Sequence, residues 1–282
     1  MPTITFAGLT ITGDMSVDGF AVARLMGWYD GAPSRSVVRE RPQSDGAFGV
    51  SRYYRGARVI TVEGEWVGST MADAYAARDT LAGVQADGLP STFTVTDELG
   101  ARSCEVTLEK SPVIDDVLRA PFFAWSFDVV ARDPRKYGAE VTASTGVPTS
   151  GTGYTWPATW PATWGSGGSP GRVTLTNTGT SDTSPTLEVS GGLGGGVELV
   201  EITTGSYLRL EREIPTSSTV FFDTRTARVY LDIPANDISS FLTRRDWAGF
   251  TVPGGASRTV QFNPLGAVSG TPVLTARYAP AY

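Results

Sequence analysis

Apolar and polar residues alternate with a period of two over several segments in the first half of the chain. In the segment 58–67, one face carries Ile60, Val62, Gly64 and Trp66. The segment 122–130 repeats the pattern with bulkier side chains, namely Phe123, Trp125, Phe127 and Val129. Such alternation is typical of strands with one buried face. The other face of the second segment is also partly apolar, so we expect this strand to be central and partly covered on both sides.

One segment of the first half, from Met71 to Val84, has helical spacing instead. Thr70 and Asp73 form a candidate capping box at its start, and Ala74, Tyr75, Arg78, Leu81 and Ala82 follow the helical period. Gly83 or Gly88 can end the helix, because glycine tolerates the left-handed conformation found at many helix termini. The first half is therefore predicted to be a β domain with one helix.

Composition changes between residues 138 and 171, where threonine, serine, glycine and proline replace most aliphatic residues. Such a segment cannot supply its own packed core, so we predict domains at 1–138 and 172–282 with a linker at 139–171. The linker contains a Trp-Pro-Ala-Thr repeat with tryptophans at Trp156, Trp160 and Trp164. We favour packing on a neighbouring domain or subunit over glycan stacking as the role of these rings.

Short apolar segments return after the linker at near-regular intervals, which predicts a β-sandwich. They span residues 173–176, 187–190, 197–203, 207–210, 220–223, 228–231, 260–262 and 274–278. The glycine run 191–196 lacks the lysine and following helix of a phosphate loop, so we interpret it as a flexible hairpin connection. The predicted class is therefore mainly β throughout.

Charge and cysteine content narrow the possible functions. The net charge is −6, with scattered basic residues, which disfavours stable DNA binding but would suit a conduit that repels passing phosphates. The single cysteine, Cys104, falls on the apolar face of a predicted strand at 101–109, and one cysteine allows no internal disulfide. Because no basic-then-apolar leader and no apolar run of about 18 residues occurs, we expect neither standard secretion nor membrane insertion.

The chain has no histidine, which removes Ser-His-Asp and Cys-His catalysis and all histidine-ligated metal sites. Two acidic pairs, Glu63 with Glu65 and Glu211 with Glu213, have a spacing that a glycosidase could use, but we interpret them as solvent-facing strand residues. The segment 14–19 begins like a calcium-binding loop, yet Leu25 stands where the bidentate glutamate is needed. We therefore predict no catalytic, cofactor-binding or metal-binding residues.

Several short motifs occur in an order that resembles one known family, the siphophage distal tail (Dit) proteins. The first half ends in Asp133-Pro134-Arg135-Lys136-Tyr137, similar to the Asp-Pro-x-Lys-Tyr end of that family's N-terminal domain. The second half has the motif residues Asn177, Thr178, Gly179, Pro185, Asp223, Trp247, Pro253 and Gly254 in the order of the family's C-terminal domain. The stretch 255–258 departs from that pattern, and the linker is longer than the family core requires.

The resemblance implies a non-catalytic virion protein at the phage tail tip, made in the host cytoplasm. It implies a tail-tube-like N-terminal β-sandwich or barrel that forms a ring, usually hexameric, and a galectin-like C-terminal β-sandwich. Implied partners are other copies of the chain, the tail tube protein, tail tip or tail-associated proteins and receptor-binding proteins, with DNA only in transit and no cofactor. Two alternatives remain open from the residues alone: a carbohydrate-binding module for host-surface recognition and an enzyme acting on cell-wall glycan.

Overall fold

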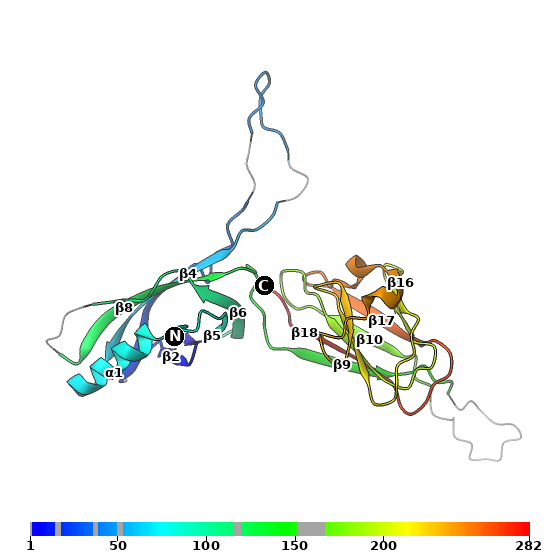
Figure 1. The fold of residues 1–282 in the computed structure, drawn as a ribbon. Coiled ribbons are helices and arrows are strands. Elements are labelled where there is room, and N and C mark those ends of the chain that lie inside the picture. The colour runs from blue at the N-terminus through cyan, green and yellow to red at the C-terminus, as the bar shows by residue number, and fades with distance from the viewer. Residues whose placement is uncertain (1, 15–17, 36–38, 50–52, 116–119, 152–166) are drawn as a thin grey trace, which may run out of the picture. The chain divides into compact units, whose positions relative to one another are not determined.

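The computed structural model describes residues 2–14, 18–35, 39–49, 53–115, 120–151 and 167–282. The chain divides into a first unit, Met1–Tyr137, and a second unit, Gly138–Tyr282, each with its own hydrophobic core. Both units are built mainly from strands (Figure 1). The mainly β prediction is confirmed.

The first unit is a closed barrel-like sheet with the strand order β4-β3-β2-β1-β5-β6-β8, in which β8 pairs back onto β4. Its strands are β1 (Thr3–Phe6), β2 (Leu9–Thr12), β3 (Gly19–Met26), β4 (Arg58–Val67), β5 (Ser91–Asp97), β6 (Gly100–Leu108) and β8 (Phe122–Ala131), with the short β7 (Val113–Ile114) beside β8. The closing pair runs antiparallel over ten positions, from Arg58 opposite Ala131 to Val67 opposite Phe122. Closure removes the exposed strand edges that an open sheet would leave.

Aromatic side chains fill the interior of this barrel. The alternation predicted for β4 and β8 is confirmed: Ile60, Val62, Phe123, Trp125, Phe127 and Val129 are buried. The helix α1 (Met71–Ala82) buries Ala74, Ala77 and Leu81 against the same core. Thr70 caps it by accepting a hydrogen bond of 3.2 Å from the backbone N of Asp73, and Gly83 ends it with φ −83°, outside the left-handed region.

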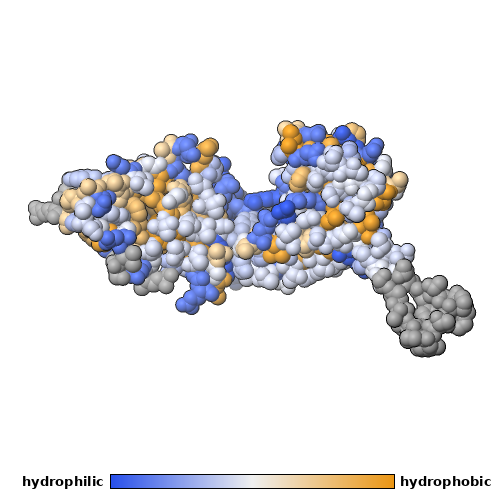
Figure 2. Space-filling model, turned by 90° about the horizontal axis from the view of Figure 1, so that it is seen from below, coloured by the Kyte–Doolittle hydropathy of each residue, from blue (hydrophilic) through white to orange (hydrophobic). Residues whose placement is uncertain are grey.

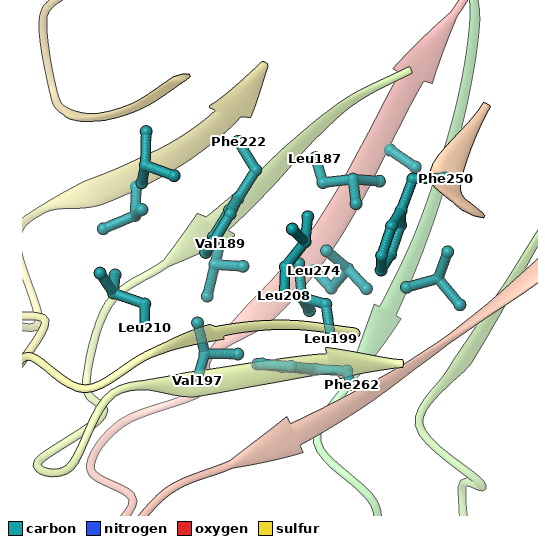
Figure 3. Close-up of a cluster of buried hydrophobic side chains, with 14 of the residues drawn as sticks. Leu187, Val189, Val197, Leu199, Leu208, Leu210, Phe222, Phe250, Phe262 and Leu274 are labelled. Carbon is teal, nitrogen blue, oxygen red and sulfur yellow. The ribbon is translucent and has the colours of Figure 1, made fainter. Parts of the chain in front are cut away.

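The second unit is a sandwich of two five-stranded sheets, ordered β10-β17-β12-β13-β16 and β15-β14-β11-β18-β9. The strands are β9 (Val141–Gly146), β10 (Arg172–Thr176), β11 (Thr186–Ser190), β12 (Val197–Glu201), β13 (Ser206–Leu210), β14 (Thr219–Asp223), β15 (Arg228–Leu231), β16 (Leu242–Arg245), β17 (Ser257–Pro264) and β18 (Val273–Tyr278). Two short 3-10 helices, η1 (Ser239–Phe241) and η2 (Trp247–Phe250), flank β16. Leu187, Val189 and Phe222 from one sheet meet Val197, Leu199, Leu208 and Phe262 from the other (Figure 3).

The structure corrects two expectations about connecting segments. Residues 141–146, placed in the predicted linker, form β9 and pair antiparallel with β18. The pattern missed this strand because it is rich in threonine and serine and its partner is about 130 residues away. The glycine run 191–196 is a largely buried crossover from one sheet to the other, not a flexible hairpin: Leu193 is fully buried and bridges Ile214 and Val268, and only Gly194 is exposed. The tryptophan repeat lies outside the described residues.

Candidate functional site

The Asp133–Tyr137 motif follows β8 and holds the chain segment that leaves β3. The Lys136 Nζ donates a hydrogen bond of 3.0 Å to the carbonyl oxygen of Trp28 and lies 5.3 Å from the centre of that indole ring. The Tyr137 hydroxyl donates to Asp133 Oδ2 at 2.7 Å, and its backbone pairs with Ser103 on β6. The motif is therefore a set of side chains that fixes the end of the barrel.

Arg58, at the first position of β4, is the central cation of this cluster. Its side chain donates to the carbonyl oxygens of Gly27 and Asp30 at 2.7 Å each and of Pro134 at 2.9 Å. The residue is only 3% exposed although it carries a charge. Hydrogen bonds to several carbonyl dipoles are what allow such a cation to remain buried. Sequence reasoning treated Arg58 only as the start of a strand.

The titratable groups of this cluster are shifted in directions that follow from burial. Burial lowers the pKa of Arg58 and of Lys136, and the positive charges of Arg58 and Arg102 lower the pKa of Lys136 further. Burial alone would raise the pKa of Asp133, but hydrogen bonds from Arg135 and Tyr137 outweigh it and hold that pKa below its ordinary value. Burial raises the pKa of the Cys104 thiol to about 12, although the positive charges of Arg58 and Lys136 act to lower that pKa. The predicted burial of Cys104 is confirmed.

This cluster stands at the root of a long excursion between β3 and β4, which we call the arm (residues 31–57). Backbone hydrogen bonds join residues 33–35 to 54–56 near its root and residues 39–41 to 46–48 nearer its tip. Figure 1 shows the described parts of the arm extending away from the barrel. Phe48, Tyr53 and Tyr54 are 60–64% exposed there. The arm has five arginines and two acidic residues, a net charge of +3 in a chain of net charge −6.

The outer surface of the barrel carries an open hollow of about 440 Å³ over β3, β4, β7 and β8, which we call the groove. Its lining includes the carboxylates of Glu63, Glu65 and Asp115, together with Val113, which is 66% exposed. Glu63 lies 4.0 Å from the guanidinium of Arg24. The structure thus brings one of the two predicted acidic pairs together with a third acid. Sequence spacing could not reveal Asp115 as its neighbour.

In the second unit, the first family-motif residues form a buried hydrogen-bonded cluster around the side chain of Asn177, which we call the Asn177 cluster. Its amide nitrogen donates to the carbonyl oxygens of Ser181 and Val252, and its amide oxygen accepts from the backbone N of Gly179 and Ala281. Gly179 packs so closely that a Cβ there would lie 1.9 Å from the Ala281 oxygen. Local chain packing accounts for these motif positions.

The remaining motif residues of the second unit also occupy turns and supporting positions. Pro253-Gly254 directly follows Val252, whose carbonyl oxygen belongs to the Asn177 cluster. A Cβ on Gly254 would lie 2.5 Å from the Thr180 backbone. Asp223 ends β14 and accepts hydrogen bonds from the backbone N of Arg225 and Thr226. Trp247 begins η2 and is partly buried against the core.

The other predicted chemical candidates are dispersed. Glu211 forms an ion pair of 2.8 Å with Arg209, and Asp18 accepts a hydrogen bond from Ser69. Residues 15–17 of the calcium-like segment and Trp156, Trp160 and Trp164 lie outside the described residues. Within the described ranges, no three His, Cys, Asp or Glu side chains are grouped so that they could hold a metal ion, and this includes the three acids of the groove. No described helix is long and apolar enough to cross a membrane.

The fold is that of proteins from phage tail hubs and baseplates. The Dit protein (gp 19.1) of SPP1, described as a paradigm of the hub adsorption apparatus in phages that infect Gram-positive bacteria, has a structure similar to this chain with a TM-score of 0.69. The match covers 100% of this chain and 99% of that one at 18% sequence identity. The resemblance to distal tail proteins is thus confirmed at the level of the fold.

Two structures of the phage P2 baseplate in its activated conformation, with Ca and with Sr, contain chains of similar fold. Their TM-scores are 0.54 and 0.52, each at 8% identity and over 98% of this chain. No protein-family model and no curated protein matches the sequence. The similarity therefore lies in the arrangement of strands rather than in residue identity.

Proposed function

We propose that this chain is a non-catalytic distal tail protein of a long-tailed bacteriophage. The first unit, residues 1–138 in the organisation proposed from the sequence, forms a ring that continues the tail tube and lets DNA pass. The second unit, a galectin-like sandwich that includes β9, faces tail tip or receptor-binding proteins. The family resemblance gives six as the number of subunits in the ring.

The observation that carries this proposal is the end-to-end similarity to the SPP1 Dit structure. The match includes both units and nearly the whole of each chain, so a shared single domain does not account for it. Fold alone does not establish function, because one fold can serve many roles. Here the order of the family motifs along the sequence supports the same assignment independently.

The surface supports a role in assembly. On the face shown in Figure 2, apolar residues of each unit lie in small groups separated by polar ones. The arm differs, since it carries three bulky aromatic side chains that are at least 60% exposed. Exposed aromatic residues together with arginines are typical of the central parts of protein interfaces. The chemistry of the arm therefore favours a protein partner.

Electron microscopy of the purified full chain tests the proposal. We expect ring-shaped particles in negative stain and a mass by light scattering that is a fixed multiple of the 29.9 kDa chain. A monomer that persists at the highest soluble concentration would contradict the proposal. Activity on host cell wall that depends on a named carboxylate would contradict its non-catalytic part.

A further inference from the structure

We propose that residues 257–282, which we call the strap, close the second unit in the last step of its folding. The strap contains β17, β18 and the four residues that follow β18. Until the strap inserts, neither sheet of the sandwich is complete. The proposal goes beyond the proposed function, because it concerns the second unit by itself and holds whether or not the chain forms a ring.

Both strands of the strap take inner positions in their sheets. β17 lies between β10 and β12, and β18 lies between β11 and β9. Among the strands that the structure describes, β10 pairs only with β17, and β9 pairs only with β18. The two strands that begin the second unit therefore have no partner until the two strands that end it are in place.

Side chains of the strap also complete the core between the two sheets. Val260, Phe262, Leu274 and Ala276 are each at most 1% exposed. Figure 3 shows Phe262 and Leu274 among the side chains that fill this core. A sheet with one apolar face is stable only when another layer covers that face. Before the strap inserts, β11 and β12 each lack one strand neighbour and part of that cover.

The residues after β18 bind the segments that begin the unit. Ala281 is fully buried; its backbone N donates to Asn177 Oδ1 at 3.4 Å, and its carbonyl oxygen accepts from the backbone N of Ser181 at 2.9 Å. The carbonyl oxygen of Pro280 accepts from the backbone N of Gly138 at 2.9 Å. The Asn177 cluster is therefore complete only when the end of the strap is in place.

The strap forms contacts between distant parts of the chain. Val141 lies opposite Tyr278, and Arg172 lies opposite Gln261. These partners are about 140 and about 90 residues apart, so bringing them together costs loop-closure entropy before strand pairing can compensate for it. By contrast, β12 and β13 form a hairpin with a short connection. We therefore expect the short-range pairs to form first and the strap to close last.

Closure by the strap determines when a partner can recognise the second unit. All described strands of the first unit lie before residue 137, whereas the second unit is incomplete until the strap has been synthesised. Domains generally fold as units, the N-terminal one first, while the chain is being made. The first unit is therefore ready for its contacts before the second unit presents a complete surface to any partner.

Pulsed hydrogen exchange during refolding of the full chain from urea tests the order of these steps. Unfolding for only a few seconds keeps the prolines in their native isomers, because their isomerisation takes tens of seconds or longer. Amides of β17 and β18 should gain protection in the slowest phase of the second unit, together with those of β9, β10, β11 and β12. Full protection of β11 and β12 before the strap is protected would overturn the proposal.

Two disulfide variants of the full-length protein test whether pairing of the strap limits the rate. In the strap variant, Thr174→Cys and Thr259→Cys join β10 to β17, where the two native hydroxyl oxygens lie 3.1 Å apart. In the control variant, Glu198→Cys and Arg209→Cys join β12 to β13 at directly paired positions. Both variants carry Cys104→Ala in the first unit, so that the two new cysteines can pair only with each other, and both are oxidised while folded.

The reduced form of each variant is its own reference. Oxidation of the strap variant should accelerate the slowest phase on the order of tenfold or more, because the disulfide closes the long loop in advance. Oxidation of the control should accelerate that phase far less, because its disulfide closes a hairpin that forms early. Equal acceleration in the two variants, or none in the strap variant, would overturn the proposal. None of these measurements involves the ring, so failure of the proposed function would leave the strap unaffected.

Discussion

Replacing Arg58 by methionine is expected to loosen the root of the arm and to destabilise the first unit. The methionine side chain is uncharged and replaces only the aliphatic part of arginine, so it keeps the packing of that part without donating hydrogen bonds. The carbonyl oxygens of Gly27, Asp30 and Pro134, which now accept at 2.7, 2.7 and 2.9 Å, would lose their donor. The variant therefore tests whether this cluster holds the segment before the arm.

The expected magnitude follows from opposing contributions. The three hydrogen bonds shorter than 3.0 Å contribute about 1.5–3 kcal/mol each because their donor is charged, or roughly 4.5–9 kcal/mol together. A fourth, to the carbonyl oxygen of Trp28, is longer at 3.4 Å and is left out of the sum. Against this, methionine avoids the cost of several kcal/mol for keeping a cation buried, and the lowered pKa of Arg58 shows that burial disfavours its charge. Some of the freed carbonyls can bind water instead. The net loss in the free energy of unfolding should be about 3 kcal/mol.

Urea unfolding followed by peptide-resolved hydrogen exchange reads the first unit separately from the second. Exchange should accelerate most in residues 27–30 and at the start of β4, while the second unit should be unchanged. Arg24→Met is the matched control, because Arg24 is exposed and its ion pair with Glu63 is long, at 4.0 Å; this change should cost under about 0.5 kcal/mol. A loss at Arg58 no greater than at Arg24 would refute the assigned role.

Three further predictions concern single side chains. Asn177→Ala should destabilise the second unit by about 2–4 kcal/mol in urea unfolding, because four hydrogen bonds are lost. Thr178→Ala, at an exposed neighbour, should have little effect, and equal losses in the two variants would contradict the role of the Asn177 cluster. Burial alone would raise the pKa of Glu201, but hydrogen bonds from Thr204 and Thr203 outweigh this effect and hold the pKa in the folded protein below its ordinary value of 4.5. The ionised Glu201 stabilises the folded protein above pH 4.5, and this stabilisation is lost as the pH falls through the pKa of Glu201 in the folded protein. In Glu201→Gln the melting temperature should therefore fall less steeply with decreasing pH than in the wild type. An unchanged pH dependence would count against this role. Cys104, with its pKa raised to about 12, should react with a thiol reagent at pH 8 only after unfolding, and rapid labelling of the folded protein would disprove its burial.

Local alternation was sufficient to predict most of the strands in the second unit. Each of the eight predicted segments overlaps an observed strand, because a strand with one buried face shows its period of two in its own residues. The helix was also predictable, since its cap and spacing are local. The strand β9 was not, because its residues are mostly small and polar and its pairing with β18 joins distant parts of the chain.

The site was predictable only in part. The sequence motif identified Asp133, Lys136 and Tyr137 as members of the cluster. It did not identify Arg58, whose role follows from contacts with residues 27–30 and 134 that form only in the folded chain. One signal was present in the sequence: Arg58 falls on the same face as Ile60 and Val62, where a charge is unusual and requires partners. The groove could not be predicted, because it combines residues from four strands.

The place of β9 has a practical consequence for dissecting the molecule. A fragment that starts at residue 172 would lack β9 and leave the backbone of Val273–Tyr278 as an open edge. Unpaired edges recruit strands from other molecules, so such a fragment should be prone to aggregate. A fragment that starts at Gly138 keeps the missing neighbour and is the better choice for producing the sandwich by itself.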